Sequence, residues 1–536
     1  MLKKGISSFN RQIHQLREGG VQILYKKIKK AFWLLFMNIL APLAIFLKIN
    51  WPESYYFIGK KNLRKLKGLR GQPNVNELTI KKIENQTIEY FKAIVDREPA
   101  LINERDWIDV SRALGDLYFL QGRMDHLDDL CQRTAEVQRK IAKTHQLDGL
   151  GIEFLPRYLP VGSIGNYEHL EAYLKAGMLG LLPAKKLISL IDSQAAINNP
   201  CYLRYWSRYI TVVSDPLLVE MLTPVENGLT IPLNLYMPLH EKIHKSFLAL
   251  GVVRDQWIKE ERLPIFTLSD EDYARGWQCL KSFGMQQDDW FVCLHVRGRG
   301  WRGDHSAVED FRNSDIHAYK LAIKAVTDAG GWVIRMGDPA MKPLPQMPRV
   351  IDYAHSDAKS DWMDVFLCAQ CRFLIGTSSG LFNFAIAFGI PVVTTNFLPT
   401  CCAYYLTSND LFIPRICWSK DENRLLNFAE LFSPAMGTAA VQCHYDHKNI
   451  KILENSEEEI KDVVEEMLER CSGRLKYSEE DEELQKRFKS MTLDCGKGYG
   501  EENAVVNARM GRSFLRKYAA LLSSEDSGVK LGYGHD

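Results

Sequence analysis

The alternation of short apolar runs with amphipathic stretches, over residues 149–396, most restricts how this chain can fold. The run WFVCLHV, Trp290–Val296, is almost continuously apolar and ends at a charged loop. A strand without apolar–polar alternation is typical of one buried on both faces of its sheet. Strands that alternate with helices along a chain form parallel sheets, with the helices on their faces. We therefore predict an α/β protein.

Two such α/β units follow each other. The first has strands predicted at 152–155, 186–191 and 210–213, with helices at 167–179 and 199–209. The second has strands at 290–296, 332–337, 371–376 and 389–396, with helices at 316–328, 362–369 and 381–388. Open α/β sheets bind ligands beyond the carboxyl ends of their strands. The sequence thus predicts two Rossmann-like domains whose ligand loops face a cleft.

Charge is distributed unevenly along the 536 residues. Residues 1–70 hold 15 Lys and Arg against two acids, a net charge of +13, while the remainder has a net charge of −11. The overall charge of +2 excludes a uniformly basic nucleic-acid binder. We predict that the N-terminal end binds an anionic surface and that no nucleic acid is bound.

The uncharged run Ala31–Leu47 extends this N-terminal prediction. Its 17 residues follow four lysines, contain Asn38 and Pro42, and fall short of the ~20 residues that a spanning helix needs. No small-residue cleavage site follows, so a signal peptide is not predicted. We predict an interfacial or re-entrant anchor at the cytoplasmic face of the inner membrane, with a buried core helix as the alternative.

Helical segments flank the two α/β units. Residues 77–96 carry an apolar stripe that includes Leu78, and 107–142 resemble one tetratricopeptide-like helical pair with a turn at Gly122. Near the C-terminus, Ser456 and Glu459 predict a capping box, 478–487 a solvated face or linker, and 507–522 an amphipathic helix. The predicted domains are 1–70, a membrane-associating segment; 76–148, a helical prefix; 149–280 and 281–455, the two Rossmann-like domains; and 456–536, closing helices with a tail.

The twelve cysteines are scattered, and the single CxxC of Cys368 and Cys371 has no second pair at zinc-site spacing. Reduced thiols in the cytosol and no metal site are expected. The sequence also lacks a P-loop lysine motif, a G-x-G-x-x-G after a strand, a nucleophile elbow and HExxH.

The strand at 290–296 ends in HVRGRGWRGD, the most informative segment of the chain. It places His295, Arg297, Arg299, Arg302 and Asp304 within ten residues, spaced by glycines. Glycine lets a backbone approach a ligand closely, and arginine offers forked donors that match phosphate oxygens. The segment predicts a site for an anionic ligand, and the alternative is an interdomain salt-bridge cluster.

A second segment, GTSSGL, joins a strand to a helix. Small hydroxyl residues in such a turn present backbone N–H groups and a helix N-terminus to an anion. We predict that Gly376, Thr377, Ser378, Ser379 and Gly380 bind a diphosphate opposite the arginines.

Residues on neighbouring strand ends complete the predicted site. Arg335 and Asp338 are predicted to contact the same ligand, or else to pair with each other. Gly165 and Asn166 are the corresponding positions of the first unit, and Asp361 is expected to cap a helix. A nucleotide-linked leaving group needs its charge stabilised, and an acceptor needs a base. The base candidates are His295, Asp304 and Asp315, while Arg312 and Asn313 are expected to orient the loop.

The run HVRGRGWRGD...RNSDIHAYKLAI...GGWVIRMGDP...VIDYAHSDAKSDWMDVFLCAQCRFLIGTSSGL resembles an uncharacterised family of bacterial glycosyltransferases from surface-polysaccharide clusters. More remotely, His295-x-Arg297 and Ser378-Ser379 are similar to the GDP-fucose-using fucosyltransferases of GT-B fold. That resemblance assigns the donor diphosphate to Arg297 and phosphate contacts to Ser378 and Ser379. Here Gly298 separates Arg297 from Arg299, where the fucosyltransferases have adjacent arginines, so a sugar nucleotide is implied but not GDP-fucose itself.

Together these observations predict an inverting, metal-independent GT-B glycosyltransferase without a cofactor, in which 149–280 is the acceptor domain and 281–455 the nucleotide-sugar domain. It would transfer a hexosyl or deoxyhexosyl group from a GDP- or UDP-linked donor to a cell-surface glycan or lipid-linked acceptor. The alternatives are a pyruvyl or phosphosugar transferase, and a non-catalytic glycan- or nucleotide-binding scaffold.

Overall fold

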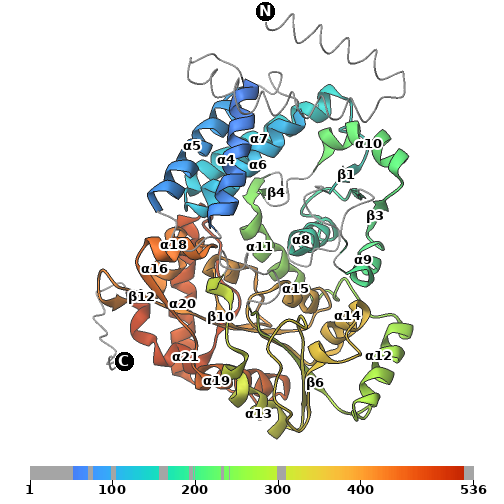
Figure 1. Ribbon diagram of the computed structural model, residues 1–536, viewed down its shortest axis with the longest axis vertical. Coiled ribbons are helices and arrows are strands. Elements are labelled where there is room, and N and C mark those ends of the chain that lie inside the picture. Colours follow the sequence, from blue (N-terminus) through green and yellow to red (C-terminus); the bar gives the residue numbers. More distant parts are fainter. Residues whose placement is uncertain are drawn as a thin grey trace, which may run out of the picture. The chain divides into compact units, whose positions relative to one another are not determined.

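The computed structural model describes residues 52–70, 77–97, 104–155, 167–191, 197, 199–230, 235–240, 242–298 and 310–523 (Figure 1). The predicted anchor at 31–47, and the predicted site residues Gly165, Asn166, Arg299, Arg302 and Asp304, lie outside these residues. The chain divides into two compact units, residues 1–69 with 75–114 and residues 70–74 with 115–536.

The first unit is helical. It contains α4 (Pro52–Arg70), α5 (Glu77–Val95) and the first part of α6 (Glu104–Leu120). Gly59 allows α4 to approach α5 closely, because a Cβ there would lie 2.4 Å from the ring of Phe91. Most of the predicted stripe on α5 is buried, but Leu78 is 73% exposed and lies off the buried face. No helix in the described part of the chain has the length and apolar character needed to cross a membrane.

The end of α6 and the helix α7 (Met124–Thr144) belong to the second unit. Two helices, α6 and α7, occupy most of the segment 107–142, with Gly122 at φ 66° in the turn between them, and their tetratricopeptide-like character stays a prediction. Next to α7 lies an antiparallel hairpin of β4 (Tyr236–Leu239) and β5 (Lys242–Lys245). The Lys245 ammonium, 1% exposed, donates to Asp128 on α7 over 2.8 Å.

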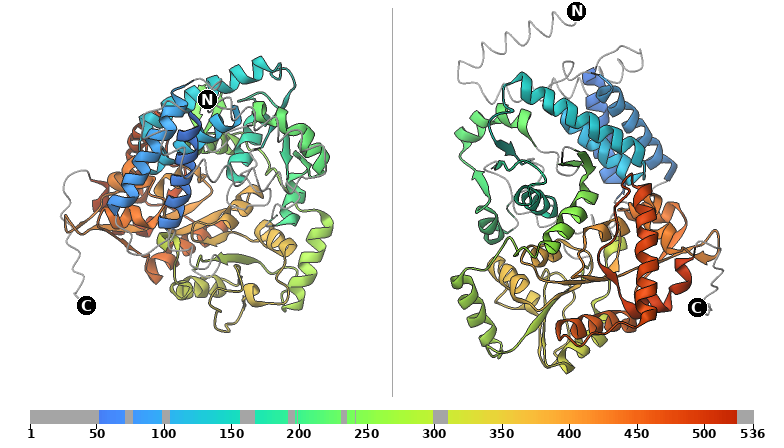
Figure 2. Two further views of the ribbon diagram at one scale, coloured as in Figure 1. Left: turned by 45° about the horizontal axis from the view of Figure 1, so that its top comes forward. Right: turned by 180° about the vertical axis from the view of Figure 1, so that it is seen from behind.

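A three-stranded parallel sheet follows, in the order β1-β2-β3. Its elements are β1 (Ile152–Phe154), α8 (Tyr167–Met178), β2 (Lys186–Leu190), α9 (Pro200–Trp206), β3 (Ile210–Val213) and α10 (Pro216–Leu229), coloured teal to green in Figure 2. The strands and helices predicted for the first α/β unit, residues 152–213, are thus confirmed to within a few residues. The α9 helix begins where the Asn199 side chain accepts from the Tyr202 N–H, 2.7 Å away.

The larger sheet has seven strands among the described residues, in the order β15-β11-β10-β9-β6-β7-β8, and every pair is parallel. The strands are β6 (Phe291–His295), β7 (Trp332–Arg335), β8 (Val350–Ile351), β9 (Leu374–Gly376), β10 (Val392–Phe397), β11 (Leu411–Pro414) and β15 (Arg509–Met510). All five residues of β6 are buried, as its apolar run predicts. The α/β prediction is confirmed.

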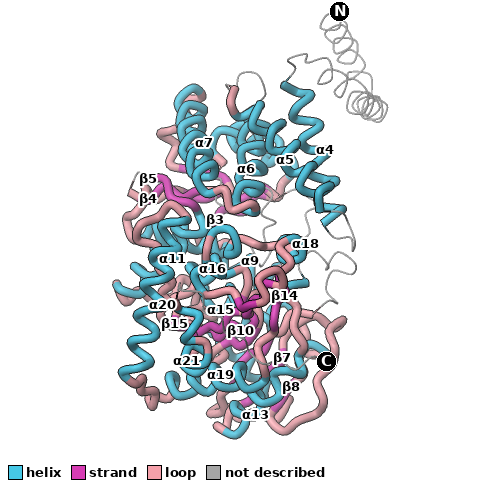
Figure 3. Tube along the Cα trace, turned by 90° about the vertical axis from the view of Figure 1, so that its left-hand side faces the viewer, coloured by secondary structure: helices cyan, strands magenta, loops and turns pink. Residues whose placement is uncertain are grey.

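Helices cover this sheet (Figure 3). Those in contact with its strands include α13 (Lys320–Asp328), η6 (Tyr353–His355), α15 (Gly380–Ala387) and α19 (Glu457–Cys471). The same part of the chain also contains α11 (Ser246–Lys259), α12 (Asp270–Ser282), η5 (Ile316–Tyr319), α14 (Asp361–Gln370) and η7 (Thr400–Tyr405). A smaller antiparallel sheet, β13-β12-β14, and short helices complete this part, namely β12 (Ile416–Ser419), β13 (Arg424–Leu425), α16 (Phe428–Phe432), α17 (Pro434–Gly437), α18 (Gln442–His447) and β14 (Ile450–Leu453). The predicted capping box at the start of α19 is confirmed, because both of its hydrogen bonds are present.

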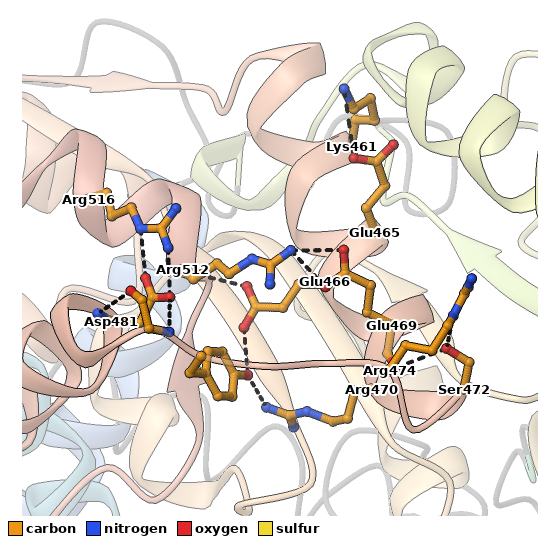
Figure 4. A network of polar contacts seen from close by, with 12 residues as sticks. Lys461, Glu465, Glu466, Glu469, Arg470, Ser472, Arg474, Asp481, Arg512 and Arg516 are labelled. Carbon is orange, nitrogen blue, oxygen red and sulfur yellow. Dashed lines mark hydrogen bonds and ion pairs between the residues drawn. The ribbon is translucent and has the colours of Figure 1, made fainter.

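The C-terminal region differs from its prediction in two places. Residues 478–487 are not a linker but begin α20 (Glu479–Gly498), where exposed residues such as Glu482 and Glu483 form the predicted solvated face. Asp481 in the same turn is buried and pairs with Arg516 through two hydrogen bonds of 2.7 and 2.6 Å (Figure 4). Residues 507–522 are not one helix. They form β15, α21 (Arg512–Lys517) and η8 (Ala519–Leu522), because Arg509 and Met510 pair with β11 at the sheet edge.

Buried contacts connect the helices beside the β1-β2-β3 sheet to the part of the chain that contains the seven-stranded sheet. Arg254 on α11 donates to Glu171 on α8 over 2.8 Å and to the carbonyl of Tyr405 over 2.9 Å. Lys175 contacts the same carboxylate, and all three charged side chains are at least 90% buried. The rings of Tyr202 and Phe384 lie 3.6 Å apart, so α9 packs directly on α15.

Candidate active site

The candidate site forms where β6 and β9 end side by side. His295 is the register partner of Gly376, and a Cβ on Gly376 would lie 2.0 Å from the His295 carbonyl oxygen. Only glycine fits at this position. The chain then turns, and the Thr377 N–H donates to the same carbonyl over 3.2 Å. The two strand ends therefore hold the predicted Thr-Ser-Ser turn against the predicted arginine loop.

The turn and the helix after it form one face of the site. Thr377, Ser378 and Ser379 are all more than 90% buried, although they are small polar residues. Ser379 occupies the N-cap of α15, but its hydroxyl makes no capping bond and lies 2.9 Å from Nδ1 of His295. The first N–H groups of a helix carry partial positive charge and attract anions. The predicted turn and helix N-terminus are thus brought together with His295.

Two arginines are anchored to this turn through its backbone and hydroxyl groups. The N–H of Arg297 donates to Thr377 Oγ1 over 3.0 Å, and the Arg312 guanidinium donates to the Ser378 carbonyl over 2.7 Å. The Ser314 N–H donates to the Arg297 carbonyl over 3.0 Å, so the chain returns to the strand end after residues 299–309. Arg312, which the sequence placed among the loop-orienting residues, lies at the turn itself.

The electrostatic environment of His295 is positive. Burial, together with the charges of Arg335, Arg297, Lys359 and Arg312, lowers the pKa of its imidazole to about 4. A cationic imidazole is disfavoured where solvent is excluded and neighbouring groups carry the same charge. His295 is consequently neutral at neutral pH, in a region whose potential favours an anion.

Arg335 and Asp338 do not form the predicted pair. The Arg335 guanidinium is buried and donates to Asp352 over 2.9 Å and to the Lys342 carbonyl over 2.8 Å. Asp338 instead accepts from the Ala340 N–H over 2.8 Å. The Arg335–Asp338 pairing is therefore wrong, because the Asp352 carboxylate at the end of the neighbouring strand β8 takes the guanidinium.

Other predicted residues have local structural contacts. Asp315 is exposed and caps η5 by accepting from the His317 N–H over 3.1 Å. Asp361 is not the cap of α14, since Ser360 holds that position and Asp361 begins the first turn. The Asn313 amide donates to Asp310 over 2.8 Å. A direct role for Asp315 or Asn313 in the reaction stays a prediction.

Sequence reasoning missed a polar network beside the arginines. Asn396 on β10 adopts φ 50° and exchanges hydrogen bonds with Asn455, whose backbone N–H donates to the Asn396 side chain over 2.8 Å. The Asn396 amide also donates to Ser314 Oγ over 3.1 Å, and Ser314 donates to Glu454 over 3.0 Å. These residues come from separate segments and share no motif. The only sequence signal was a polar residue at the end of an apolar strand.

No group of three or more His, Cys, Asp or Glu residues arranged to hold a metal ion occurs within the described ranges. Cys368 and Cys371, the predicted lone CxxC, are buried free thiols on and just after α14. Burial raises the pKa of Cys368 well above its ordinary value, so this thiol is a packing residue and not a reactive thiolate.

Comparison with known proteins gave the following findings. No protein-family profile matches the chain, and no curated protein matches it by sequence. Among solved structures, it is similar to a glycosyl transferase family 9 protein from Veillonella parvula, with 11% identity and a TM-score of 0.31 over 49% of this chain and 85% of that one.

Two further structures are from E. coli. The iron-containing dodecameric glycosyltransferase TibC of an enterotoxigenic strain has 14% identity and a TM-score of 0.26, over 48% of this chain and 60% of that one. The ADP-heptose lps heptosyltransferase II has 14% identity and a TM-score of 0.27, over 49% and 90%. At these scores the likeness is too distant to support an inference about the reaction of this chain.

Proposed function

We propose that the protein is a glycosyltransferase of GT-B type that transfers a sugar from a nucleoside diphosphate to a hydroxyl acceptor. The observation that carries the proposal is the meeting of Arg297, Arg312 and the buried Thr377–Ser379 turn at the N-terminus of α15. This arrangement brings the Arg312 guanidinium to the helix N–H groups, and the charge of Arg297 acts on the same region through His295. Guanidinium and helix N–H donors both suit phosphate oxygens.

The chemistry follows from the charge of the leaving group. When the bond between the sugar C1 and the diphosphate oxygen breaks, negative charge builds on that oxygen. Donors already in place stabilise this charge without reorganising during the reaction. Arg297 and Arg312 supply the positive charge, while the backbone of Ser379 and Gly380 supplies the helix N-terminus. Arg335 is not part of this diphosphate site, because its guanidinium is held inside the fold by Asp352.

The acceptor hydroxyl forms the new bond to C1 and must lose its proton. His295 is the base that we assign, because its imidazole is neutral at neutral pH and lies beside Ser379. A bound diphosphate would oppose the surrounding cations and raise the pKa of His295 towards the range useful for proton transfer. Asp304 and Asp315 remain the other candidates from the sequence.

In this proposal the three-stranded sheet β1-β2-β3 supplies the acceptor side. The carboxyl end of β1 leads to residues 156–166, which include Gly165 and Asn166, and α9 packs on α15 beside the donor turn. The acceptor is a cell-surface glycan or a lipid-linked glycan, and transfer takes place at the cytoplasmic face of the inner membrane. No resident cofactor or metal is part of the proposal.

Nucleotide binding by the full-length protein tests the proposal. Thermal unfolding would be followed with GDP, UDP, ADP and CMP and with their sugar conjugates, with and without EDTA. One nucleoside diphosphate should stabilise the protein by about 2.7 kcal/mol when present at a hundred times its Kd. Arg297→Ala and Arg312→Ala should each weaken that binding by about tenfold or more.

Arg262→Ala is the matched control, since Arg262 lies on the surface and pairs with exposed Glu260. It should bind the nucleotide as the wild type does. Stabilisation by phosphoenolpyruvate but by no nucleotide would replace the proposal with a pyruvyl transferase. If no nucleotide raises the midpoint, the nucleotide-sugar proposal is wrong. Binding without sugar transfer to any glycan acceptor would favour a scaffold.

A further inference from the structure

The helix α4 in the first unit carries a basic face that the proposed reaction does not use. Within Pro52–Arg70 there are six Lys and Arg and a single acid, Glu53. Lys61, Arg64 and Lys65 are all exposed, and their spacing of three and four residues places them on one side of the helix. We call these three residues the α4 basic face.

The α4 basic face lies opposite the side by which α4 packs. Gly59 and Leu66 are buried, and at 100° per residue they point away from Lys61 and Arg64. Lys60 belongs to neither set. Burial lowers the pKa of its ammonium, and its Nζ lies 5.4 Å from the centroid of the Tyr56 ring. The α4 basic face therefore lies outside the side by which α4 packs on its neighbours.

Among the described residues of this unit, the exposed faces of the other helices mix charges of both signs. On α5, Lys81 and Lys82 share their face with Glu89, and the first turn of α6 begins with Glu104 and Asp106. On α4, by contrast, the three exposed cations lie within five residues that include no acid. Such a face attracts polyanions, and its attraction to a membrane adds up over the cations within a Debye length of anionic headgroups.

We propose that the α4 basic face docks on the anionic headgroups of a phospholipid membrane. The position of α4 in the chain argues for lipid over nucleic acid. The helix starts five residues after the uncharged run Ala31–Leu47, which itself follows four lysines within residues 26–30. Apolar residues next to clustered cations bind a bilayer through two kinds of attraction, whereas an apolar run of this length adds nothing to RNA binding.

Vesicle sedimentation with the full-length protein tests this inference. The probes are vesicles of phosphatidylcholine alone and vesicles of phosphatidylcholine with an equal part of phosphatidylglycerol. Wild type should bind the anionic vesicles more tightly, and the preference should fall as salt is raised. The triple variant Lys61→Gln, Arg64→Gln, Lys65→Gln should lower the partition coefficient on anionic vesicles by about a hundredfold, at roughly fivefold per cation. Its binding to neutral vesicles should not change.

The matched control removes the same charge from α5, through Lys81→Gln, Lys82→Gln, Lys92→Gln, three exposed lysines of the same unit. Both triple variants should unfold at the wild-type temperature. An equal loss in the two variants, or an unchanged anionic preference in the α4 variant, would overturn the inference. The inference would also be overturned if single-stranded RNA displaced the wild type, but not the α4 variant, from anionic vesicles. The α4 basic face would then be a site for nucleic acid. Nucleotide affinity does not enter this test, so its outcome is independent of the proposed transferase activity.

Discussion

Glu171 and His295 are both almost fully buried, but the charges around them differ. Glu171 lies between Arg254 and Lys175; burial alone would raise its pKa, and the two cations outweigh burial and hold the pKa below its ordinary value. The four strongest charged neighbours of His295 are all cations, and they act with burial to lower its pKa to about 4. The first cluster satisfies its charge inside the fold. The second keeps a positive potential at the strand ends, as a site for an anion requires.

The C-terminal helices hold two further buried carboxylates with different surroundings. The carboxylate of Glu466 accepts from the Arg512 backbone N–H over 2.7 Å and from the Tyr477 hydroxyl over 2.8 Å, and Asp481 holds Arg516 nearby (Figure 4). Burial raises the pKa of Glu466, whereas hydrogen bonds from Arg516, whose side chain is 43% exposed, and from Ser478 outweigh burial and lower the pKa of Asp481. We expect substitutions in such clusters to affect stability, and substitutions at the β6–β9 edge to affect ligand binding.

Removing Glu171 should give the largest loss of stability. In Glu171→Ala, the guanidinium of Arg254, which is 2% exposed, stays buried without its carboxylate. The free energy of unfolding should fall by about 3–5 kcal/mol, as measured by urea denaturation. A loss below about 1 kcal/mol would show that this cluster is not closed as described. Nucleotide affinity of the folded fraction should stay at the wild-type value.

Stability should next depend on pH through His295 and His169. Burial, helped by neighbouring cations, lowers the pKa of both to about 4, against 6.5 in the unfolded chain. Their stabilising contribution is fully present above pH 6.5 and is lost as the pH falls from 6.5 to 4, because the unfolded state binds the protons first. Each shift is worth roughly 3 kcal/mol. Urea denaturation across this range should show His295→Asn losing part of the slope, and an unchanged slope would contradict the low pKa.

Substitutions of Arg335 and Arg312 should have different effects: the first should lower the free energy of unfolding, and the second should lower nucleotide affinity. Arg335→Met leaves Asp352 without its guanidinium and should lower the free energy of unfolding by about 1–3 kcal/mol. Arg312→Met should change it by less than about 1 kcal/mol while weakening nucleotide binding. Calorimetric titration of both variants with the stabilising nucleotide provides the check. The reverse pattern would mean that Arg335, and not Arg312, faces the ligand.

The smallest effect is expected from an exposed ion pair. Lys324 and Asp328 lie 2.6 Å apart on α13, with side chains 68% and 63% exposed. Lys324→Ala should change the free energy of unfolding by less than about 0.5 kcal/mol, because water screens the pair. A change of several kcal/mol in urea denaturation would remove the contrast between exposed and buried pairs on which the preceding predictions depend.

Local sequence pattern predicted much of the sheet and of the site. The apolar run before His295 and the glycine-serine turn after Gly376 were both recognisable, and both lie at parallel strand ends as predicted. By contrast, β15 joins the sheet from more than 90 residues beyond β11, and its two residues carry no strand signal of their own. Residues 478–487 read as a linker because their charges hide the buried positions of α20, among them Asp481.

The sequence by itself determined where the strands and most helices begin, which segments carry cations, and that small hydroxyl residues stand at a strand end. These properties depend on local periodicity and residue chemistry. Only the tertiary structure decided which charges meet: Arg335 with Asp352, Arg312 with the Ser378 carbonyl, and Glu171 with Arg254. The physical reason is that pairing is set by strand order and helix packing, which bring together residues from segments that share no local pattern.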